Sequence, residues 1–313
     1  MRDPSCQVQA VFGPVPSRRL GMSLGLDLLL PKTCSLDCVY CELGPTTRLT
    51  AQRAAYRDPE AILAELAQRL GELESPPDHI TLAGSGEPSL HSGLGAILRR
   101  VRELTPARRA VLTNATLVGD PAVRADLCEA DLLAPSLDAV SEAAFRRVNR
   151  PAQGLSAAAM RAGLIALRRE FAGEMWLEIL LVEGYNDSDQ ELELLMAAAR
   201  EIAPDRVQLN TVVRPPALSG ARPLSDARLA AIAAAFPLPA EVIAPPQARG
   251  GADHGSLAHQ VVEMTRRRPC TVADLIAMTG LGPEQTRGLV DDLLARGLLQ
   301  GEPFGDLTYY RGV

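Results

Sequence analysis

Three cysteines stand close together near the start of the chain. Cys34, Cys38 and Cys41 form a Cys-x3-Cys-x2-Cys segment. In a reducing compartment, such a tight group indicates metal binding rather than disulfides. Thiolates at this spacing can bind three irons of a cubane [4Fe–4S] cluster and leave the fourth iron open to a chelating molecule. The segment therefore predicts an iron–sulfur cluster with one open iron.

Two other interpretations of these cysteines remain open. Structural zinc takes four ligands, usually as two paired knuckles, and no second cysteine pair exists here. A zinc-stabilised binding module is therefore the weaker hypothesis, and coincidental core cysteines are a third. The four histidines, His79, His91, His254 and His259, do not have knuckle spacing from the clustered cysteines. The other cysteines are far apart in sequence and are predicted to be small apolar residues; they are Cys6, Cys128 and Cys270.

A second segment with chemical potential is Gly84-Ser85-Gly86-Glu87-Pro88. It follows a short apolar run that reads as a strand. Glycines let a ligand approach the backbone closely, and the Glu87 carboxylate can accept a hydrogen bond from an ammonium group. By itself the segment is typical of a turn, but after a cysteine loop it favours ligand binding.

Short apolar runs alternate with helical patterns along most of the chain. Asp58-Pro59 and Asp120-Pro121 mark helix starts, and Ser188 with Glu191 predicts a capping box that opens a helix through Arg200. This alternation predicts an α/β fold, a (βα)6-type partial TIM barrel with chemistry at the carboxyl ends of its parallel strands. The predicted strands are Leu24–Leu30, His79–Ala83, Ala110–Thr113, Leu132–Ser136, Trp176–Val182, Arg206–Val213 and Glu241–Ala244.

The pattern changes near residue 250. Residues 245–256 are rich in proline and glycine and predict a linker, so we expect one domain over residues 1–250 and another over 251–313. Helices are predicted over Leu257–Arg267, Val272–Thr279 and from Pro283 to about Arg296. Leu298-Leu299 and Leu307–Tyr310 can then pair as a wing. This outline predicts a small α+β winged helix-turn-helix domain.

The composition bears on partners and location. The chain has 313 residues and a net charge of −6, which disfavours a nucleic-acid partner because such affinity comes from clustered Lys and Arg. No apolar run approaches the ~20 residues that cross a bilayer, and the first residues contain no secretory h-region. We therefore expect a cytoplasmic protein with no membrane partner.

The two segments resemble the radical S-adenosylmethionine (SAM) superfamily. The resemblance implies a [4Fe–4S] cluster on Cys34, Cys38 and Cys41, with SAM on its open iron. One electron would cleave SAM to methionine and a 5′-deoxyadenosyl radical that abstracts hydrogen from a substrate. Tyr40 is expected near the adenine, Gly86-Glu87 at the methionine amino group, and Ser136 with Asp138 at the ribose or methionine carboxylate. The SAM-binding residues it implies are Tyr40, Ser85, Gly86, Glu87, Pro88, Asn114, Ser136 and Asp138.

Further segments are similar to a poorly characterised radical SAM group related to wybutosine-synthesis enzymes. They are Gly13–Gly21, Gly184–Asp187 and Leu209–Pro216, and the resemblance covers about residues 11–250. The chain lacks the flavodoxin-like domain and the second cysteine cluster of some relatives. An external low-potential electron donor of flavodoxin or ferredoxin type is therefore implied, and the substrate, a peptide or a small molecule, stays unnamed.

Asn210 and Arg214 follow the sixth predicted strand and are candidate substrate contacts. Arg214 can clamp an anionic group, or it can pair with a carboxylate such as Asp138 or Glu178. A different class of function also fits a cluster joined to a winged helix, an iron–sulfur redox sensor that regulates transcription. The acidic third helix and the whole barrel argue against that alternative.

Overall fold

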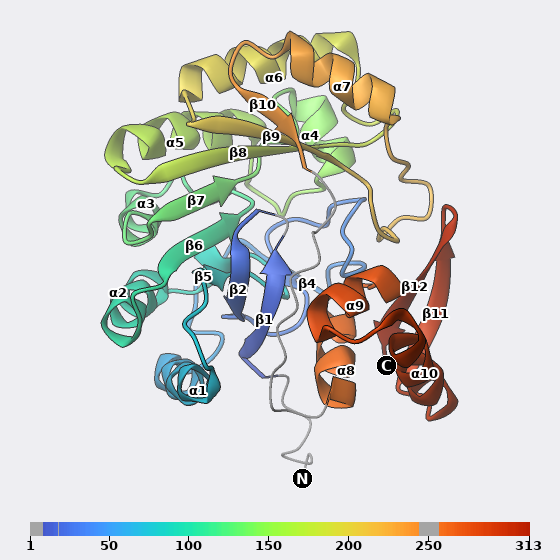
Figure 1. Cartoon of the computed structure of the whole chain (residues 1–313). Coiled ribbons are helices and arrows are strands. Elements are labelled where there is room, and N and C mark those ends of the chain that lie inside the picture. Colours follow the sequence, from blue (N-terminus) through green and yellow to red (C-terminus); the bar gives the residue numbers. More distant parts are fainter. Residues whose placement is uncertain (1–8, 18, 244–256) are drawn as a thin grey trace.

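The computed structural model describes residues 9–17, 19–243 and 257–313. Its largest element is one sheet with the strand order β1-β2-β5-β6-β7-β8-β9-β10 (Figure 1). The strands from β2 onward pair in parallel, and β1 pairs antiparallel with β2. The strands are β1 (Val11–Ser17), β2 (Gly21–Leu26), β5 (His79–Leu82), β6 (Arg108–Thr113), β7 (Leu132–Pro135), β8 (Glu174–Leu181), β9 (Arg206–Thr211) and β10 (Ala240–Val242).

Helices connect each parallel strand to the next and cover the outside of the curved sheet (Figure 1). Because consecutive strands are also neighbours in the sheet, the architecture is that of a partial βα barrel, as predicted. The helices are α1 (Pro59–Glu72), α2 (Leu94–Leu104), α3 (Pro121–Leu127), α4 (Glu142–Val148), α5 (Ala157–Glu170), α6 (Asp189–Ile202) and α7 (Asp226–Ala235), with a short 3-10 turn η2 (Pro88–Leu90) and a minor pair β3 (Thr33–Cys34) and β4 (Arg48–Leu49).

The first part of the sheet differs from the prediction. The predicted strand Leu24–Leu30 is displaced, because the chain leaves the sheet after Leu26 and turns at Asp27, whose carboxylate accepts a hydrogen bond from the Leu29 amide. Strand β1 escaped prediction altogether, since Pro14 and Pro16 argue against a strand. The two prolines are tolerated because β1 is an edge strand with an irregular register, where a missing backbone N–H removes little strand pairing.

Helix starts follow the predicted caps, with one correction. Asp58 and Asp120 accept hydrogen bonds from the first turns of α1 and α3, and Ser188 caps α6. The predicted capping box at Ser188 is wrong, however. The Glu191 carboxylate accepts hydrogen bonds from the Val140 and Ser141 amides instead of the Ser188 amide. Glu191 thus ties α6 to the chain just after β7.

The C-terminal residues form a separate small unit beside β1 (Figure 1). It consists of α8 (Leu257–Arg267), α9 (Val272–Thr279), α10 (Pro283–Ala295) and the antiparallel strands β11 (Leu299–Phe304) and β12 (Leu307–Gly312). These elements lie close to their predicted positions. The predicted boundary at residues 250 and 251, the end of the predicted strand at Ala244, and Arg18 lie outside the described residues.

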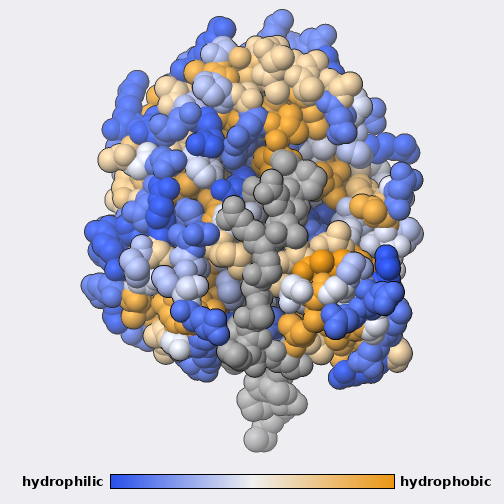
Figure 2. Space-filling view, viewed as in Figure 1, coloured by the Kyte–Doolittle hydropathy of each residue, from blue (hydrophilic) through white to orange (hydrophobic). Residues whose placement is uncertain are grey.

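The C-terminal unit has a core of its own that reaches β1. Val261, Met264, Leu275 and Leu293 pack together with Val15 of β1. Hydrophobic side chains gather in the middle of this face, below α6 and α7 and around α8 and α9, while hydrophilic side chains cover the helices at the left edge (Figure 2). In the described residues no helix is long and apolar enough to cross a membrane.

Candidate functional site

The three clustered cysteines lie in the segment that follows β2, with Cys34 in the short strand β3. An N–H group of another side chain lies beside each of the three sulfurs. The Lys32 ammonium lies 3.1 Å from Cys41 Sγ. The side-chain amide nitrogen of Asn114 lies 3.5 Å from Cys34 Sγ, and that of Asn149 lies 3.5 Å from Cys38 Sγ. None of the three cysteines is in a disulfide. Donors aimed at sulfur stabilise the thiolate form that binds iron.

The cysteine loop is fastened to two neighbouring elements. The amides of Asp37 and Val39 donate to the Asn149 and Val148 carbonyls at the end of α4, both at 3.0 Å. Ser35 shares a hydrogen bond of 2.7 Å with Thr116, after β6. The loop is therefore held at the carboxyl end of the barrel, where the chemistry of such folds is located.

Burial makes the thiols of Cys34 and Cys38 weak acids. It raises the pKa of Cys34 to about 12, with the nearby Glu87 carboxylate adding to the shift. Burial also raises the pKa of Cys38 well above the ordinary value, and Asp138 contributes. Iron binding to these two sulfurs would therefore displace protons, as metal–thiolate bonds generally do.

The donor set fits a cluster better than a single ion. Within residues 9–17, 19–243 and 257–313, no three His, Cys, Asp or Glu side chains are gathered around one point where an ion can sit. A zinc site requires such a group. A cubane cluster takes one thiolate on each of three irons, so its ligands are spread over a face. The zinc interpretation stays the weaker hypothesis.

The Gly84–Pro88 segment touches the cysteine loop directly. A Cβ atom on Gly86 would lie 1.7 Å from the Thr33 carbonyl oxygen, so only glycine fits where β3 passes this segment. The Glu87 amide donates to the same oxygen at 3.3 Å. Ser85 donates to the buried Asp27 carboxylate, and Pro88 begins the η2 turn. The predicted SAM segment and Cys34 are thus packed against each other.

The Glu87 carboxylate is buried and already accepts several hydrogen bonds. One oxygen accepts from the Ser89 amide at 2.9 Å and the Thr113 hydroxyl at 2.6 Å, and the other from the Asn114 amide at 2.6 Å. Burial raises its pKa above the ordinary value. Glu87 therefore ties the end of β5 to the end of β6, and its predicted contact with an amino group can use only its remaining acceptor capacity.

Tyr40 and Asp138 are joined by a hydrogen bond from the phenol to the carboxylate. The same carboxylate accepts from Asn149 at 2.7 Å and from the Leu180 amide at 2.9 Å, and burial raises its pKa to about 6. Asn149 thus bridges Cys38 and Asp138. Ser136 pairs with the end of β6 through its amide, on the same rim. The structure brings these residues together, while their contacts with SAM stay predictions.

The candidate substrate residues are both engaged in the protein. Asn210 donates to Glu178 at 3.1 Å. Arg214 is buried and lies 3.3 Å from Glu42 and 3.4 Å from Asp274 of α9, and its Nε donates to the Pro269 carbonyl. Its partners therefore differ from the expected Asp138 or Glu178, and one belongs to the C-terminal unit.

A cavity of about 400 Å³ opens beside the cysteine loop. Its wall includes Tyr40, Cys41 and Gly86 from the predicted cofactor site, and Asn210 with Arg214 from the predicted substrate site. It also includes residues of α8, so the cavity lies between the barrel and the C-terminal unit. Its position and size suit a small substrate or a peptide side chain.

Sequence reasoning missed two donors at the cysteines. Lys32 is the only lysine of the chain and stands two residues before Cys34, which is the one local signal for its role. Asn149 follows α4 as its C-cap residue, 111 positions from Cys38, and no local pattern marks it.

A family model described as "Radical SAM superfamily" matches residues 28–196, more than half of the chain. Among solved structures, the fold is similar to a radical SAM methyltransferase from Sphaerobacter thermophilus, with a TM-score of 0.51 and 22% identity over 70% of this chain and 65% of that one. It is also similar to Streptococcus suis SuiB bound to precursor peptide SuiA, with a TM-score of 0.52 and 13% identity over 77% of this chain and 50% of that one. At these identities the two structures support the fold alone.

Sequence relatives are closer. A "UPF0026 protein" from Synechocystis is 40% identical over 66% of this chain and 76% of its own length, and one from Methanocaldococcus jannaschii is 34% identical over 66% and 64%. A protein called "GTPase Obg" from Brachyspira hyodysenteriae is 39% identical over 70% of this chain but only 32% of its own length. This chain has no phosphate-binding P-loop, because its one lysine follows Pro31 rather than glycine.

The matched region contains the cysteine loop, the Gly86 contact and the Asp138 network. The chain therefore belongs to the radical SAM superfamily, whose enzymes use a [4Fe–4S] cluster and S-adenosylmethionine.

Proposed function

We propose that this chain is a radical SAM enzyme that holds its cluster on Cys34, Cys38 and Cys41 and acts on a substrate in the neighbouring cavity. The observation that carries the proposal is the arrangement of three free thiols, each with its own N–H donor, against the Gly86 segment. When bound, the cluster and SAM supply a 5′-deoxyadenosyl radical for hydrogen abstraction, with the electron coming from an external flavodoxin- or ferredoxin-type donor.

The residues around the cysteines have separate tasks in this proposal. Lys32, Asn114 and Asn149 donate to the sulfurs and orient them. Tyr40 and Asp138 hold the last turn of the loop in place and line the expected SAM site, together with Ser85, Pro88 and Ser136. Gly86 leaves room for the close passage of β3. The cavity wall keeps water from the reacting atoms once substrate fills it.

Residues 257–313 are proposed to be a winged-helix-like module that serves docking or substrate binding rather than DNA reading. Its third helix, α10, exposes Glu284, Asp291 and Asp292, and these charges repel phosphates. Across residues 255–313, six arginines face seven acidic residues. We expect no salt-dependent binding to duplex DNA, which an electrophoretic shift assay at low salt checks. Specific DNA binding that follows cluster oxidation would favour the sensor alternative instead.

The decisive experiment is anaerobic reconstitution with iron and sulfide, followed by dithionite and SAM. We expect 5′-deoxyadenosine and iron loading that both require the three cysteines, tested one at a time as alanine variants. Cys128→Ala is the matched control, because Cys128 is also a free cysteine but lies at the end of α3, away from the site. A Cys41→Ala variant with full SAM cleavage would exclude the proposal.

A further inference from the structure

Helix α8 brings two consecutive arginines to the cavity. Its inner side, with Val261 and Met264, packs on Val15 of β1, and this contact fixes the end of the helix over the barrel opening. Arg267 and Arg268 then line the same cavity as Tyr40 and Cys41. The C-terminal unit is thus part of the wall of the proposed substrate site.

The side chain of Arg267 is buried without enough acceptors. It is 6% exposed, its Nη2 donates to the Gln9 carbonyl, and its guanidinium carbon lies 4.5 Å over the Phe12 ring. Its Nε and Nη1 have no hydrogen-bond partner within the part of the chain that the structure describes. The nearest carboxylate oxygen in an ion pair, on Glu263, is 3.9 Å away. Burial accordingly lowers the pKa of Arg267.

Arg268 shows the same deficit. Its Nε is buried and likewise lacks a partner among the described residues. The other two arginines of this cavity differ, because Arg19 pairs with Glu178 at 2.6 Å and Arg214 pairs with Glu42 and Asp274. Buried N–H groups on a charged side chain are seldom left without an acceptor, so the unpaired atoms call for a ligand.

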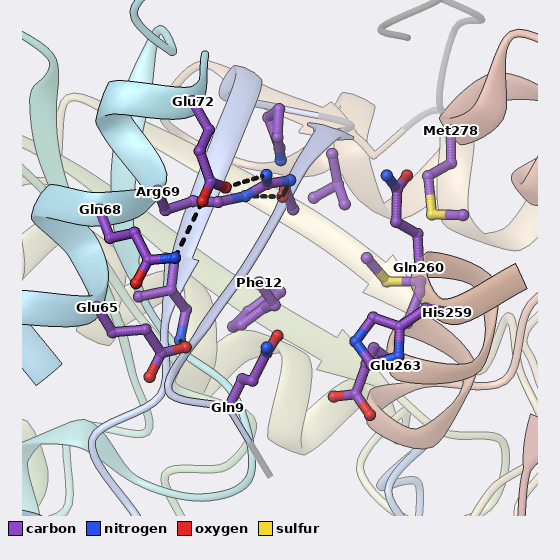
Figure 3. A pocket seen from close by; sticks show the side chains of 15 residues that line it. Gln9, Phe12, Glu65, Gln68, Arg69, Glu72, His259, Gln260, Glu263 and Met278 are labelled. Carbon is purple, nitrogen blue, oxygen red and sulfur yellow. Dashed lines mark hydrogen bonds and ion pairs between the residues drawn. The ribbon is translucent and has the colours of Figure 1, made fainter. Parts of the chain in front are cut away.

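A second cavity of about 260 Å³, which shares the lining residues Phe12, Val15 and Met264 with the first, does not offer the same chemistry. It is lined by Glu65, Glu72 and Glu263, and its one arginine, Arg69, is bound to Glu72 and to the Gly13 carbonyl (Figure 3). An anion is repelled there. The second cavity also contains a buried donor without an acceptor, Gln260 Nε2, but this group is neutral, whereas the charged Arg267 and Arg268 line the cavity beside the cysteine loop.

We propose that Arg267 and Arg268 bind an anionic group of the substrate, a carboxylate or a phosphate, in the cavity beside the cysteine loop. A guanidinium presents N–H groups in a fork that matches either oxyanion. This inference rests on the proposed function and names its substrate class. It also gives the C-terminal unit a role, because α8 completes the substrate site that the barrel leaves open.

The test uses the reconstituted full-length chain and inorganic phosphate as the probe. Phosphate affinity is measured by calorimetry. The midpoint temperature of thermal unfolding is also compared between a phosphate buffer and a sodium chloride solution of equal ionic strength. We expect phosphate to raise the midpoint of the wild type. Arg268→Gln should weaken phosphate binding by about tenfold or more, since a charged hydrogen bond is lost. Arg268 is half-buried, so this variant folds even where Arg267→Gln does not.

The matched control is Arg266→Gln. Arg266 neighbours the pair on α8 but is exposed, and it donates to the Val313 carbonyl away from the cavity. It should bind phosphate as the wild type does. Equal phosphate effects in the wild type and Arg268→Gln overturn the proposal.

SAM also has a carboxylate, so its binding is measured separately. Basal behaviour is checked in Arg266→Gln, where we expect the dissociation constant of SAM and 5′-deoxyadenosine formation without substrate to equal those of the wild type. The dissociation constant of SAM is then measured in Arg268→Gln. Weakened SAM binding without any phosphate effect would assign the arginines to SAM and overturn the substrate assignment. A wild type that binds phosphate through these arginines but never cleaves SAM would contradict the proposed function and leave the anion site standing.

Discussion

Gly86→Ala should disable the cysteine loop from a position that bears no reactive group. The added Cβ would lie 1.7 Å from the Thr33 oxygen and 2.7 Å from the Thr33 carbonyl carbon. Because these are backbone atoms, no side-chain rotation relieves the contact, and Thr33 must withdraw by about 1.3 Å to reach even a tight 3.0 Å. Cys34 is the next residue and has to follow. We expect a loss of ~1–3 kcal/mol in the free energy of unfolding, typical of overpacking.

The functional loss should exceed the loss of stability. A displacement of about 1 Å in a catalytic constellation costs on the order of 100-fold in rate. The assays are urea unfolding of the iron-free protein, iron content after reconstitution, and 5′-deoxyadenosine yield. Gly71→Ala is the control, since a Cβ there meets nothing within 4 Å and alanine is favoured inside α1. A Gly86→Ala variant with wild-type iron content and wild-type yield would refute the reasoning.

Three further predictions concern single side chains. Lys32→Met should shift the midpoint potential of the cluster to a more negative value, because a cation beside the Cys41 sulfur favours the reduced state. Lys32→Arg keeps the cation and should preserve the midpoint potential. Redox titration followed by electron paramagnetic resonance measures the potential of both variants. The pKa of Asp138 is raised to about 6 in the folded protein, so the stability that its protonated form contributes is fully present below about pH 4 and is lost as the pH rises through 6. The free energy of unfolding of the wild type, relative to that of Asp138→Asn, should therefore fall by up to about 3 kcal/mol between pH 4 and 7. Urea unfolding at a series of pH values measures this change. Arg214→Met should lower the free energy of unfolding by about 3 kcal/mol, since the nearly buried Asp274 loses its cationic partner and keeps only its hydrogen bonds from Thr271. Urea unfolding measures the change, and unchanged stability would return Arg214 to the role of substrate ligand.

Much of the framework follows from local sequence. The cysteine spacing and the glycine segment are contiguous motifs, and helix starts such as Asp58-Pro59 are read from two or three residues. The C-terminal elements could be placed because their boundaries carry strong local markers, such as the cap at Thr271 and the stop at Gly280. Strand β1 could not be placed, because its prolines are tolerated only at a sheet edge, and an edge is a property of the whole sheet.

The contacts that give the site its chemistry are not local. Asn149 reaches Cys38 across 111 residues, and Arg267 reaches the cavity from a separate unit. Ser188 and Glu191 show the converse, since the local capping rule predicted a bond that a tertiary contact with Val140 took over. Propensity decides where an element begins, while the partners of a buried polar group depend on what the fold brings near it.

The surroundings of the cysteine loop and the α8 wall of the cavity differ in their charged groups. Around the cysteine loop, burial raises the pKa of Cys34, Cys38, Glu87 and Asp138, because removal from water disfavours the negative form of each group. Positive charge placed beside these groups would offset that loss of hydration. Iron and the sulfonium and ammonium groups of SAM bring such charge. The α8 side is the reverse, with guanidinium N–H groups that lack acceptors. If both proposals hold, the positive groups of the cofactor and an anionic substrate would use different groups of the protein, and the substrate would lie beside the cofactor without competing for the same contacts.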